Sequence, residues 1–267
     1  MDDDSSWIDA RLEPVLATAD EHGLSVVRET VEEPGDRWYG RLLAASFETT
    51  ATTATTQEPE AVESAAAAVE LFRGYCRLRS RLLVQVADRW PHSITLEPTA
   101  ALLGGDYLYT AAYSMLGSVT HPALGDCFDV LTATATGIAE SFADTYAGPE
   151  GSEWDQPAFF DETAGTVGEG AAVLGATLAG ADDAQRDRLA TVGRGLSTAR
   201  QIHHVLDAGP VAAMVVPPTI DERHLREHAE RCRTDALRAL DALSASGDAT
   251  TLRAFDPAEG STMAGDA

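Results

Sequence analysis

The chain has 267 residues, and its 43 acidic residues far outnumber its 19 basic ones, so the formal net charge is −24 at pH 7. A chain this acidic lacks the basic face that contacts phosphates, which argues against a nucleic-acid partner. It also lacks any run of 18 apolar residues, so we expect no membrane span.

The basic residues are all Arg, and neither Lys nor Asn occurs. Such a chain repels itself in dilute buffer, and molar salt relieves the repulsion by shortening the screening length to about 3 Å. We therefore expect a salt-accumulating halophilic archaeal source, with an acidic mesophilic protein as the alternative. The acidic N-terminus has no apolar segment of the secretory type. The three scattered cysteines (Cys76, Cys127, Cys232) argue against a disulfide framework or a zinc site. We expect a cytoplasmic protein.

Helices are predicted along the whole chain, because Ala-, Leu-, Glu- and Arg-rich stretches show helical spacing and alternating strand patterns do not recur. The breaks fall at glycine and proline clusters. The segment 47–60 is predicted to be a polar connector and 246–267 a disordered acidic tail. The predicted helices are 6–22, 36–48, 58–90, 98–117, 122–146, 157–180, 184–208 and 221–245.

Several of these helices are apolar nearly all round, as in TAALLGGDYLYTAAYSML at 99–116. A helix without a polar face is typical of the centre of a large bundle. The sequence therefore predicts an all-α fold with a single helical domain over 1–245, since no linker divides the long helices.

Four segments in order resemble the trans-isoprenyl diphosphate synthases, the polyprenyl synthetase family. They are AAAAVELF at 65–72, LLGGDYLYTAAYSML at 102–116, ETAGTVGEGAAVLGATLAGA at 162–181 and ARQIHHVLD at 199–207. The resemblance covers roughly 36–245 and implies a single large bundle of the isoprenoid synthase type. Dimers are common in that family, so it also implies a homodimer or a heterodimer with a catalytic prenyl synthase subunit.

The resemblance implies a first aspartate-rich motif that this chain has lost. In the family, two such motifs hold Mg²⁺ on a substrate diphosphate, which requires hard oxygen ligands. Here the three aspartate positions are Ser80, Arg81 and Val84, and Arg81 would place a permanent positive charge where a cation should bind. The family's early GKRxRP patch is reduced to Gly40-Arg41.

The second motif is changed to HHVLD, in which His203 and His204 stand in place of two aspartates and Asp207 keeps the third. His203 and Asp207 share a helical face and are weak candidates for metal binding. Imidazole suits Zn²⁺, Ni²⁺ or Cu²⁺ better than Mg²⁺. The alternative is that the histidines form hydrogen bonds to Arg or Glu neighbours on a buried polar face.

An arginine stripe is the second candidate site. Arg73, Arg77 and Arg81 recur every four residues, and Arg89 follows nearby. Bidentate guanidinium groups at these four positions would bind a diphosphate without metal. In the alternative, the stripe pairs with acids of adjacent helices or of a partner subunit.

Four further residues carry predictions. Asp106, which follows two glycines in an apolar helix, is expected to be a buried acid that needs a partner, and Asp144 matches the acid of a family pattern. Both are candidates to line a cavity. His224 and His228, four residues apart, are expected to lie on a solvated helix face.

These observations favour a catalytically degenerate relative of the family that acts as a non-catalytic or regulatory subunit or binds a prenyl diphosphate. No cofactor is then expected. One alternative is an active synthase with a rebuilt Arg/His diphosphate site, in which case Mg²⁺ is expected. The other is a ligand-free interaction scaffold, which predicts a central cavity filled with large side chains.

Overall fold

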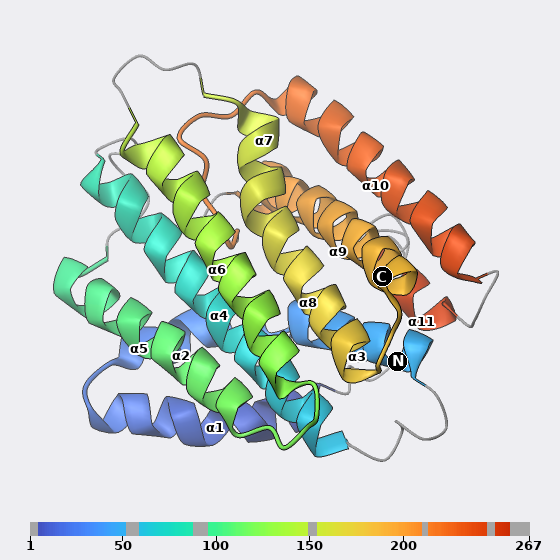
Figure 1. Ribbon diagram of the computed structural model, residues 1–267. Helices are drawn as coiled ribbons and strands as arrows, with labels where there is room; N and C mark the ends of the chain where they lie inside the picture. The colour runs from blue at the N-terminus through green and yellow to red at the C-terminus, as the bar shows by residue number, and fades with distance from the viewer. Residues whose placement is uncertain are drawn as a thin grey trace, which may run out of the picture.

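The computed structural model describes residues 5–51, 59–87, 96–148, 154–209, 213–244 and 249–256. All regular structure in these ranges is helical, which confirms the all-α prediction (Figure 1). The helices are α1 (Ser6–Glu21), α2 (Ser25–Glu32), α3 (Trp38–Thr50), α4 (Pro59–Val86), α5 (Pro98–Gly117), α6 (Leu124–Tyr146), α7 (Gln156–Phe160), α8 (Thr166–Leu178), α9 (Asp183–His203), α10 (Glu222–Ser244) and α11 (Thr250–Arg253), with π-helical turns η1 (Asp161–Gly165) and η2 (His204–Ala208). Within the described ranges, none of these helices has both the length and the apolar character to cross a membrane.

The long helices α5, α4, α6, α8, α9 and α10 run side by side across the view of Figure 1, and α3 packs behind α8 and α4. Helix α8 lies at the centre, and ten of its thirteen residues are buried. Its glycines allow this close packing: a side chain at Gly168 would overlap the carbonyl oxygen of Gly193 on α9. A side chain at Gly175 would overlap that of Leu43 on α3. The glycine-rich sequence of α8 therefore brings its neighbours into backbone contact on two sides.

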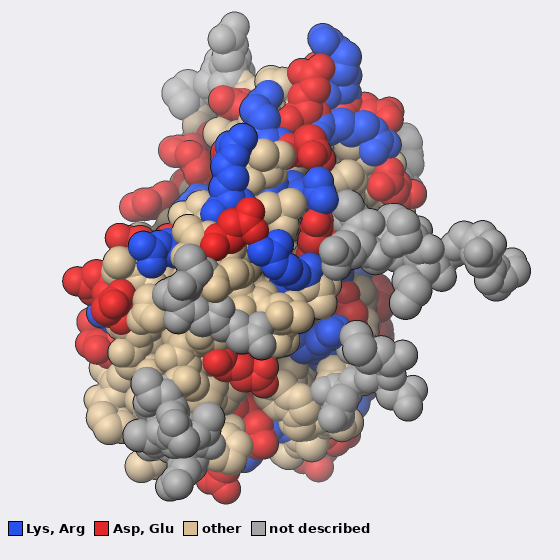
Figure 2. All heavy atoms as spheres, turned by 90° about the vertical axis from the view of Figure 1, so that its right-hand side faces the viewer, with Lys and Arg blue, Asp and Glu red and all other residues tan. Residues whose placement is uncertain are grey.

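Helix α10 covers one outer face, and the side of the molecule that bears it faces the viewer in Figure 2. Arginine and acidic side chains alternate over the upper part of that face. Local ion pairs account for much of the alternation, since Arg226 bonds Glu222 at 3.0 Å and Arg238 bonds Asp235 at 2.7 Å. Such exposed pairs contribute little stability individually.

Three boundaries differ from the sequence prediction. Helix α2 was not predicted, and α3 continues to Thr50, into the segment assigned to a polar connector. The helix predicted over 157–180 is divided into α7, η1 and α8. Pro157 does not interrupt the helix, because it lies in the first turn of α7. The division comes from the π-helical turn at Asp161–Gly165, which has a wider hydrogen-bond spacing than an α-helix.

The predicted disordered tail is partly wrong. Residues 249–256 form α11 and a turn, and their two large apolar side chains are buried, with Leu252 at 0% and Phe255 at 6% exposure. Phe255 packs edge-on against Trp38 of α3, with ring centroids 5.5 Å apart. Asp256 is also buried and is held by Arg233, so tertiary contacts order a segment whose composition favours disorder. Residues 257–267 lie outside the described ranges.

Candidate functional site

The region between α4 and α9 is bordered by the segments that resemble the two family motifs, and a segment of the chain itself lies in it. Residues 213–216 are almost completely buried, at 0–4% exposure. The amide of Met214 donates to Gln201 Oε1 of α9 at 3.1 Å, and the amide of Val216 donates to Ser80 Oγ of α4 at 2.8 Å. Four apolar residues thus bridge the two motif helices.

Ser80 therefore has a structural contact at the first-motif position. It is fully buried, and its hydroxyl accepts the Val216 hydrogen bond. Val84 is fully buried as well. Neither side chain carries a carboxylate, the ligand type that Mg²⁺ prefers.

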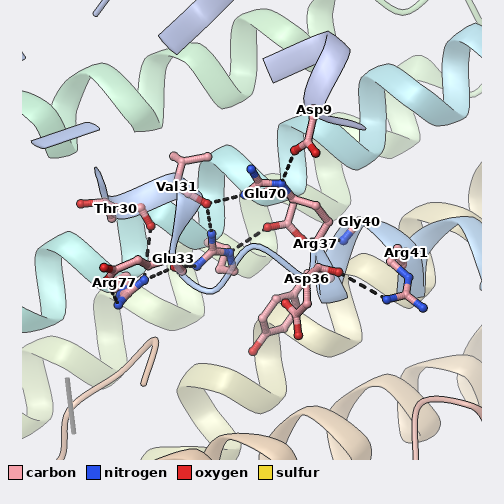
Figure 3. A network of polar contacts seen from close by, with 12 residues as sticks. Asp9, Thr30, Val31, Glu33, Asp36, Arg37, Gly40, Arg41, Glu70 and Arg77 are labelled. Carbon is pink, nitrogen blue, oxygen red and sulfur yellow. Dashed lines mark hydrogen bonds and ion pairs between the residues drawn. The ribbon is translucent and has the colours of Figure 1, made fainter. Parts of the chain in front are cut away.

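Two arginines of the stripe, Arg73 and Arg77, bond to the turn between α2 and α3, and Figure 3 shows Arg77 beside Thr30 and Glu33. Arg73 donates to the carbonyl oxygens of Val31 at 2.7 Å and Glu33 at 3.0 Å and to Glu70 Oε2 at 2.8 Å. Arg77 donates to the carbonyl oxygens of Thr30 and Glu33 and forms an ion pair with the Glu33 carboxylate at 2.9 Å. These arginines cap the carbonyl groups that the end of α2 leaves without helical partners.

Burial supports the same conclusion, since Arg73 is 3% and Arg77 1% exposed. Burial, together with the positive charges of Arg81 and Arg73, lowers the pKa of Arg77 to about 9. Burial also lowers the pKa of the half-buried Arg81. The diphosphate-binding prediction for Arg73 and Arg77 is therefore corrected: their donors hold the protein's own backbone. Arg89 lies outside the described residues.

The second motif lies at the end of α9 and in η2. His203 Nδ1 is 3.6 Å from Asp207 Oδ2, and Arg226 of α10 donates to Asp207 Oδ1 at 3.0 Å. Burial, with a smaller effect from Arg200, lowers the pKa of His204 to about 4. In the described ranges, no cluster of three or more metal-ligating side chains includes His203 or Asp207.

A pocket of about 550 Å³ opens beside this motif and reaches the C-terminal turn. Arg200 pairs with Asp36, and Arg233 pairs with Asp256 through bonds of 2.5 and 2.7 Å. The lining carries three arginines and four acids, so the acids more than balance the arginines. Its residues are Asp36, Trp38, Arg41, Arg200, His203, His204, Asp207, Ala208, Glu230, Arg233, Ala254, Phe255 and Asp256.

Asp106 and Asp144 do not line this pocket or the region between α4 and α9. The side chain of Asp106 is 64% exposed and contacts Arg79 at 3.2 Å, and Asp144 is exposed on α6. The glycines before Asp106 do approach α2 and α4, because a side chain at Gly104 would lie 3.0 Å from Val26 and 3.1 Å from Leu78. The prediction of a buried acid is therefore wrong for Asp106, which faces solvent although the neighbouring Gly104 is packed against α2 and α4.

The histidine pair of α10 divides between two environments. His224 is exposed, as predicted, whereas the His228 side chain is only 12% exposed and contacts Asp161 of η1 at 2.9 Å. The prediction of a solvated face is wrong for His228. No local pattern links it to a residue 67 positions earlier, although its spacing of four from Cys232 was visible in the sequence.

Glu70 and Gln201 are two further polar residues of this region that were not predicted from the sequence. Glu70 is completely buried and accepts from the Gly40 amide at 2.9 Å as well as from Arg73. Gln201 is bonded to the 213–216 segment. The apolar run at 211–216 was the one available signal that this segment would be buried.

Comparison of the sequence with models of known families and with curated proteins finds no match. Solved structures do match. The geranyltransferase from Helicobacter pylori superposes with a TM-score of 0.69 at 17% identity, over 94% of this chain and 96% of that one. The geranylgeranyl pyrophosphate synthetase from the archaeon Geoglobus acetivorans gives 0.65 at 15% identity over 93% and 94%.

A third neighbour is the geranyl diphosphate synthase small subunit from Antirrhinum majus, with a TM-score of 0.63 at 16% identity over 94% of this chain and 97% of that one. The likeness in each case spans nearly the whole of both chains, as expected for a shared architecture. This protein therefore has the fold of the trans-isoprenyl diphosphate synthases.

Proposed function

We propose that this protein is a non-catalytic subunit with an isoprenyl-synthase-like fold that associates with a catalytic prenyl synthase. One observation carries the proposal. The 213–216 segment fills the region between the two motif helices and is hydrogen-bonded to Ser80 and Gln201. A diphosphate and its metal ions would have to displace four buried apolar residues.

The electrostatics of α4 support the same conclusion. The first-motif helix presents Arg81 in place of an acid, and Arg73 and Arg77 are bonded to the α2–α3 turn. A cation at this position would be repelled by three guanidinium groups. Loss of the metal clamp removes the electrophilic assistance that departure of a diphosphate requires.

An exposed apolar face supports association with a partner. Leu102 and Leu103 of α5 are 44% and 51% exposed, and Tyr109, two turns further along, is 37% exposed. Exposed apolar side chains grouped on one helix mark candidate protein–protein contacts, and aromatic residues are enriched in such interfaces. The small-subunit neighbour has the same architecture, which makes a heterodimer a reasonable arrangement for this chain.

The catalytic part of the proposal is tested with the full-length protein in molar KCl, Mg²⁺, isopentenyl diphosphate and allylic diphosphates of five to twenty carbons. We expect no prenyl product above that of a boiled control. Product formation at rates on the order of 1 s⁻¹, the scale of ordinary enzymes, would contradict the proposal.

The association part is tested by adding the protein to a catalytic isoprenyl diphosphate synthase from the same cells. We expect co-elution and a change in the rate or chain length of the products. Replacing Leu102 and Leu103 with Asp should abolish both effects, whereas Ile220→Asp, which alters an exposed apolar residue elsewhere, should not. Equal behaviour of the two variants would exclude α5 as the interface.

A second candidate, a rebuilt diphosphate site, is favoured by the pocket that brings Arg41, Arg200 and His203 together. It predicts micromolar binding of isopentenyl diphosphate by calorimetry. Arg41→Ala and His203→Ala should then abolish binding, and turnover if any is present, while the protein stays folded. Absence of binding by the unaltered protein would eliminate this candidate.

A further inference from the structure

Three potential metal ligands meet at the junction of η1 and α10, outside the pocket already described. His228 Nε2 is 2.9 Å from Asp161 Oδ1 and 3.3 Å from Cys232 Sγ, and Cys232 Sγ is 3.7 Å from Asp161 Oδ1. In the described part of the chain, these three form the cluster of His, Cys and acidic side chains that is compact enough to share one cation.

The three separations resemble those of a tetrahedral zinc site. Zinc bonds of about 2.3 Å to sulfur and about 2.0–2.1 Å to nitrogen and oxygen place neighbouring ligand atoms roughly 3.3–3.6 Å apart. The distances from Cys232 Sγ to His228 Nε2 and to Asp161 Oδ1 lie within about 0.2 Å of that range, so both are compatible with a shared zinc ion. The shorter nitrogen–oxygen separation is a hydrogen bond that a bound ion would widen by a few tenths of an ångström.

The backbone around the cluster is held in place by its neighbours. Arg194 Nη1 donates at 2.8 Å to the Asp161 carbonyl oxygen, which fixes the π turn that presents the carboxylate. Gly195 lets α9 approach α10 closely, because a side chain there would lie 2.5 Å from the Cys232 carbonyl oxygen. π turns of this kind occur frequently at functional sites.

We propose that Asp161, His228 and Cys232 bind a borderline divalent transition-metal ion, best matched by Zn²⁺, with water as the fourth ligand. A thiolate and an imidazole favour Zn²⁺ over Mg²⁺ or Ca²⁺. The carboxylate and the thiolate neutralise the charge of the ion, which suits a partly buried location. The scattered cysteines cannot form a zinc site with several thiolates, whereas this site needs only Cys232. The site is independent of the proposed subunit function.

Proton balance follows from the ligand chemistry. Burial, then the negative charge of Asp161, raises the pKa of Cys232 to about 12, so the thiol is protonated without metal. Binding releases that proton to solvent as the metal–sulfur bond forms. Affinity should therefore rise with pH, as for any site that binds a metal through a thiolate. Arg231 Nη2, 3.3 Å from His228 Nδ1, must turn away, because a metal on Nε2 leaves a proton on Nδ1.

Cobalt titration of the full-length, reduced protein tests the site, with Co²⁺ as the spectroscopic probe for Zn²⁺. We expect one Co²⁺ per chain, intense visible bands of tetrahedral cobalt and a near-ultraviolet thiolate-to-cobalt charge-transfer band. Added Zn²⁺ should displace the cobalt stoichiometrically. A titration without the charge-transfer band would overturn the proposal.

Matched variants assign the ligands. Cys232→Ala should lose the charge-transfer band, and His228→Gln and Asp161→Asn should weaken binding at least about tenfold. His224→Gln, one turn away on α10, and Cys127→Ala, a buried cysteine of α6, should bind like the unaltered protein. If one ligand variant fails to fold, the other two decide. Retained cobalt binding in the folded ligand variants would also overturn the proposal.

Discussion

The buried carboxylate of Glu70 is stabilised by specific hydrogen-bond and ion-pair partners. Glu70 is fully buried, and its carboxylate accepts from both the Gly40 amide and Arg73. Arg73 in turn holds the carbonyl groups at the end of α2. One carboxylate therefore connects α3, α4 and the α2–α3 turn.

Glu70→Gln should destabilise the fold by about 3–5 kcal/mol, because it keeps the shape of the side chain but leaves Arg73 as a buried charge without its partner. Denaturant unfolding measures the change in the free energy of unfolding. Asp235→Asn is the control, since its exposed pair with Arg238 should contribute less than about 1 kcal/mol. Equal effects of the two substitutions would refute this description of the network.

His204 makes stability depend on pH. Its pKa falls from 6.5 to about 4 in the folded protein, mainly through burial. Between these values the unfolded chain binds a proton that the folded chain does not, so stability should decrease as pH falls from 6.5 toward 4. A fall in the pKa from 6.5 to about 4 corresponds to roughly 3 kcal/mol.

The measurement is the free energy of unfolding at a series of pH values. His204→Gln should flatten the curve in this window, whereas His203→Gln, which removes the adjacent and more exposed histidine, should leave its slope in place. A slope that survives His204→Gln would assign the effect to other groups.

At the scale of helices, glycine contacts determine how closely α8 packs. Gly168 faces Gly193 with their backbones in contact, and no side chain fits between them. The η1 turn at the start of α8 and the η2 turn at the end of α9 then direct residues out of regular helical register. The helices can approach this closely only because glycine has no side chain, so even one added methyl group should disturb the packing.

Gly168→Ala should destabilise the protein by at least about 2 kcal/mol, because the added methyl group overlaps a backbone carbonyl that cannot rotate away. Gly125→Ala on α6 is the matched control. A side chain there meets no atom within 4 Å, so the higher helix propensity of alanine should be neutral or stabilise by up to about 1 kcal/mol. Thermal and denaturant unfolding of both variants tests the contrast.

At the scale of the whole molecule, the net charge of −24 opposes compaction. Raising KCl from about 0.1 M to about 1 M shortens the screening length from about 10 Å to about 3 Å. We therefore expect the unfolding temperature to rise steeply with salt over this range. An unfolding temperature that is independent of salt would contradict the halophilic interpretation.

A charge-reduced variant separates this effect from general salt effects on hydrophobic burial. Helix α6 carries four exposed acids that can be neutralised together by Asn or Gln: Asp126, Asp129, Glu140 and Asp144. The variant should show a shallower dependence on KCl than the unaltered protein. Identical slopes would mean that the salt effect does not arise from self-repulsion.

Much of the fold was predictable because it follows from local pattern. The lengths of α1, α5 and α6 matched the helical spacing to within a few residues, since apolar periodicity and breakers act locally. The order of four motif-like segments led to the correct architecture despite low sequence identity. The break at η1 and the short helix α2 depend on non-local contacts and were missed.

The helical class, the acidic composition and the presence of Ser80, Arg81 and Val84 where the resemblance places aspartates could be read from the chain directly, because they depend only on residue identity and spacing. Tertiary packing, by contrast, sets the directions of the polar side chains. It directed Arg73 and Arg77 to the end of α2, packed residues 213–216 against Ser80, and brought Asp161 to His228 and Cys232. Buried polar groups must find partners, and the nearest partner in space is seldom the nearest in sequence.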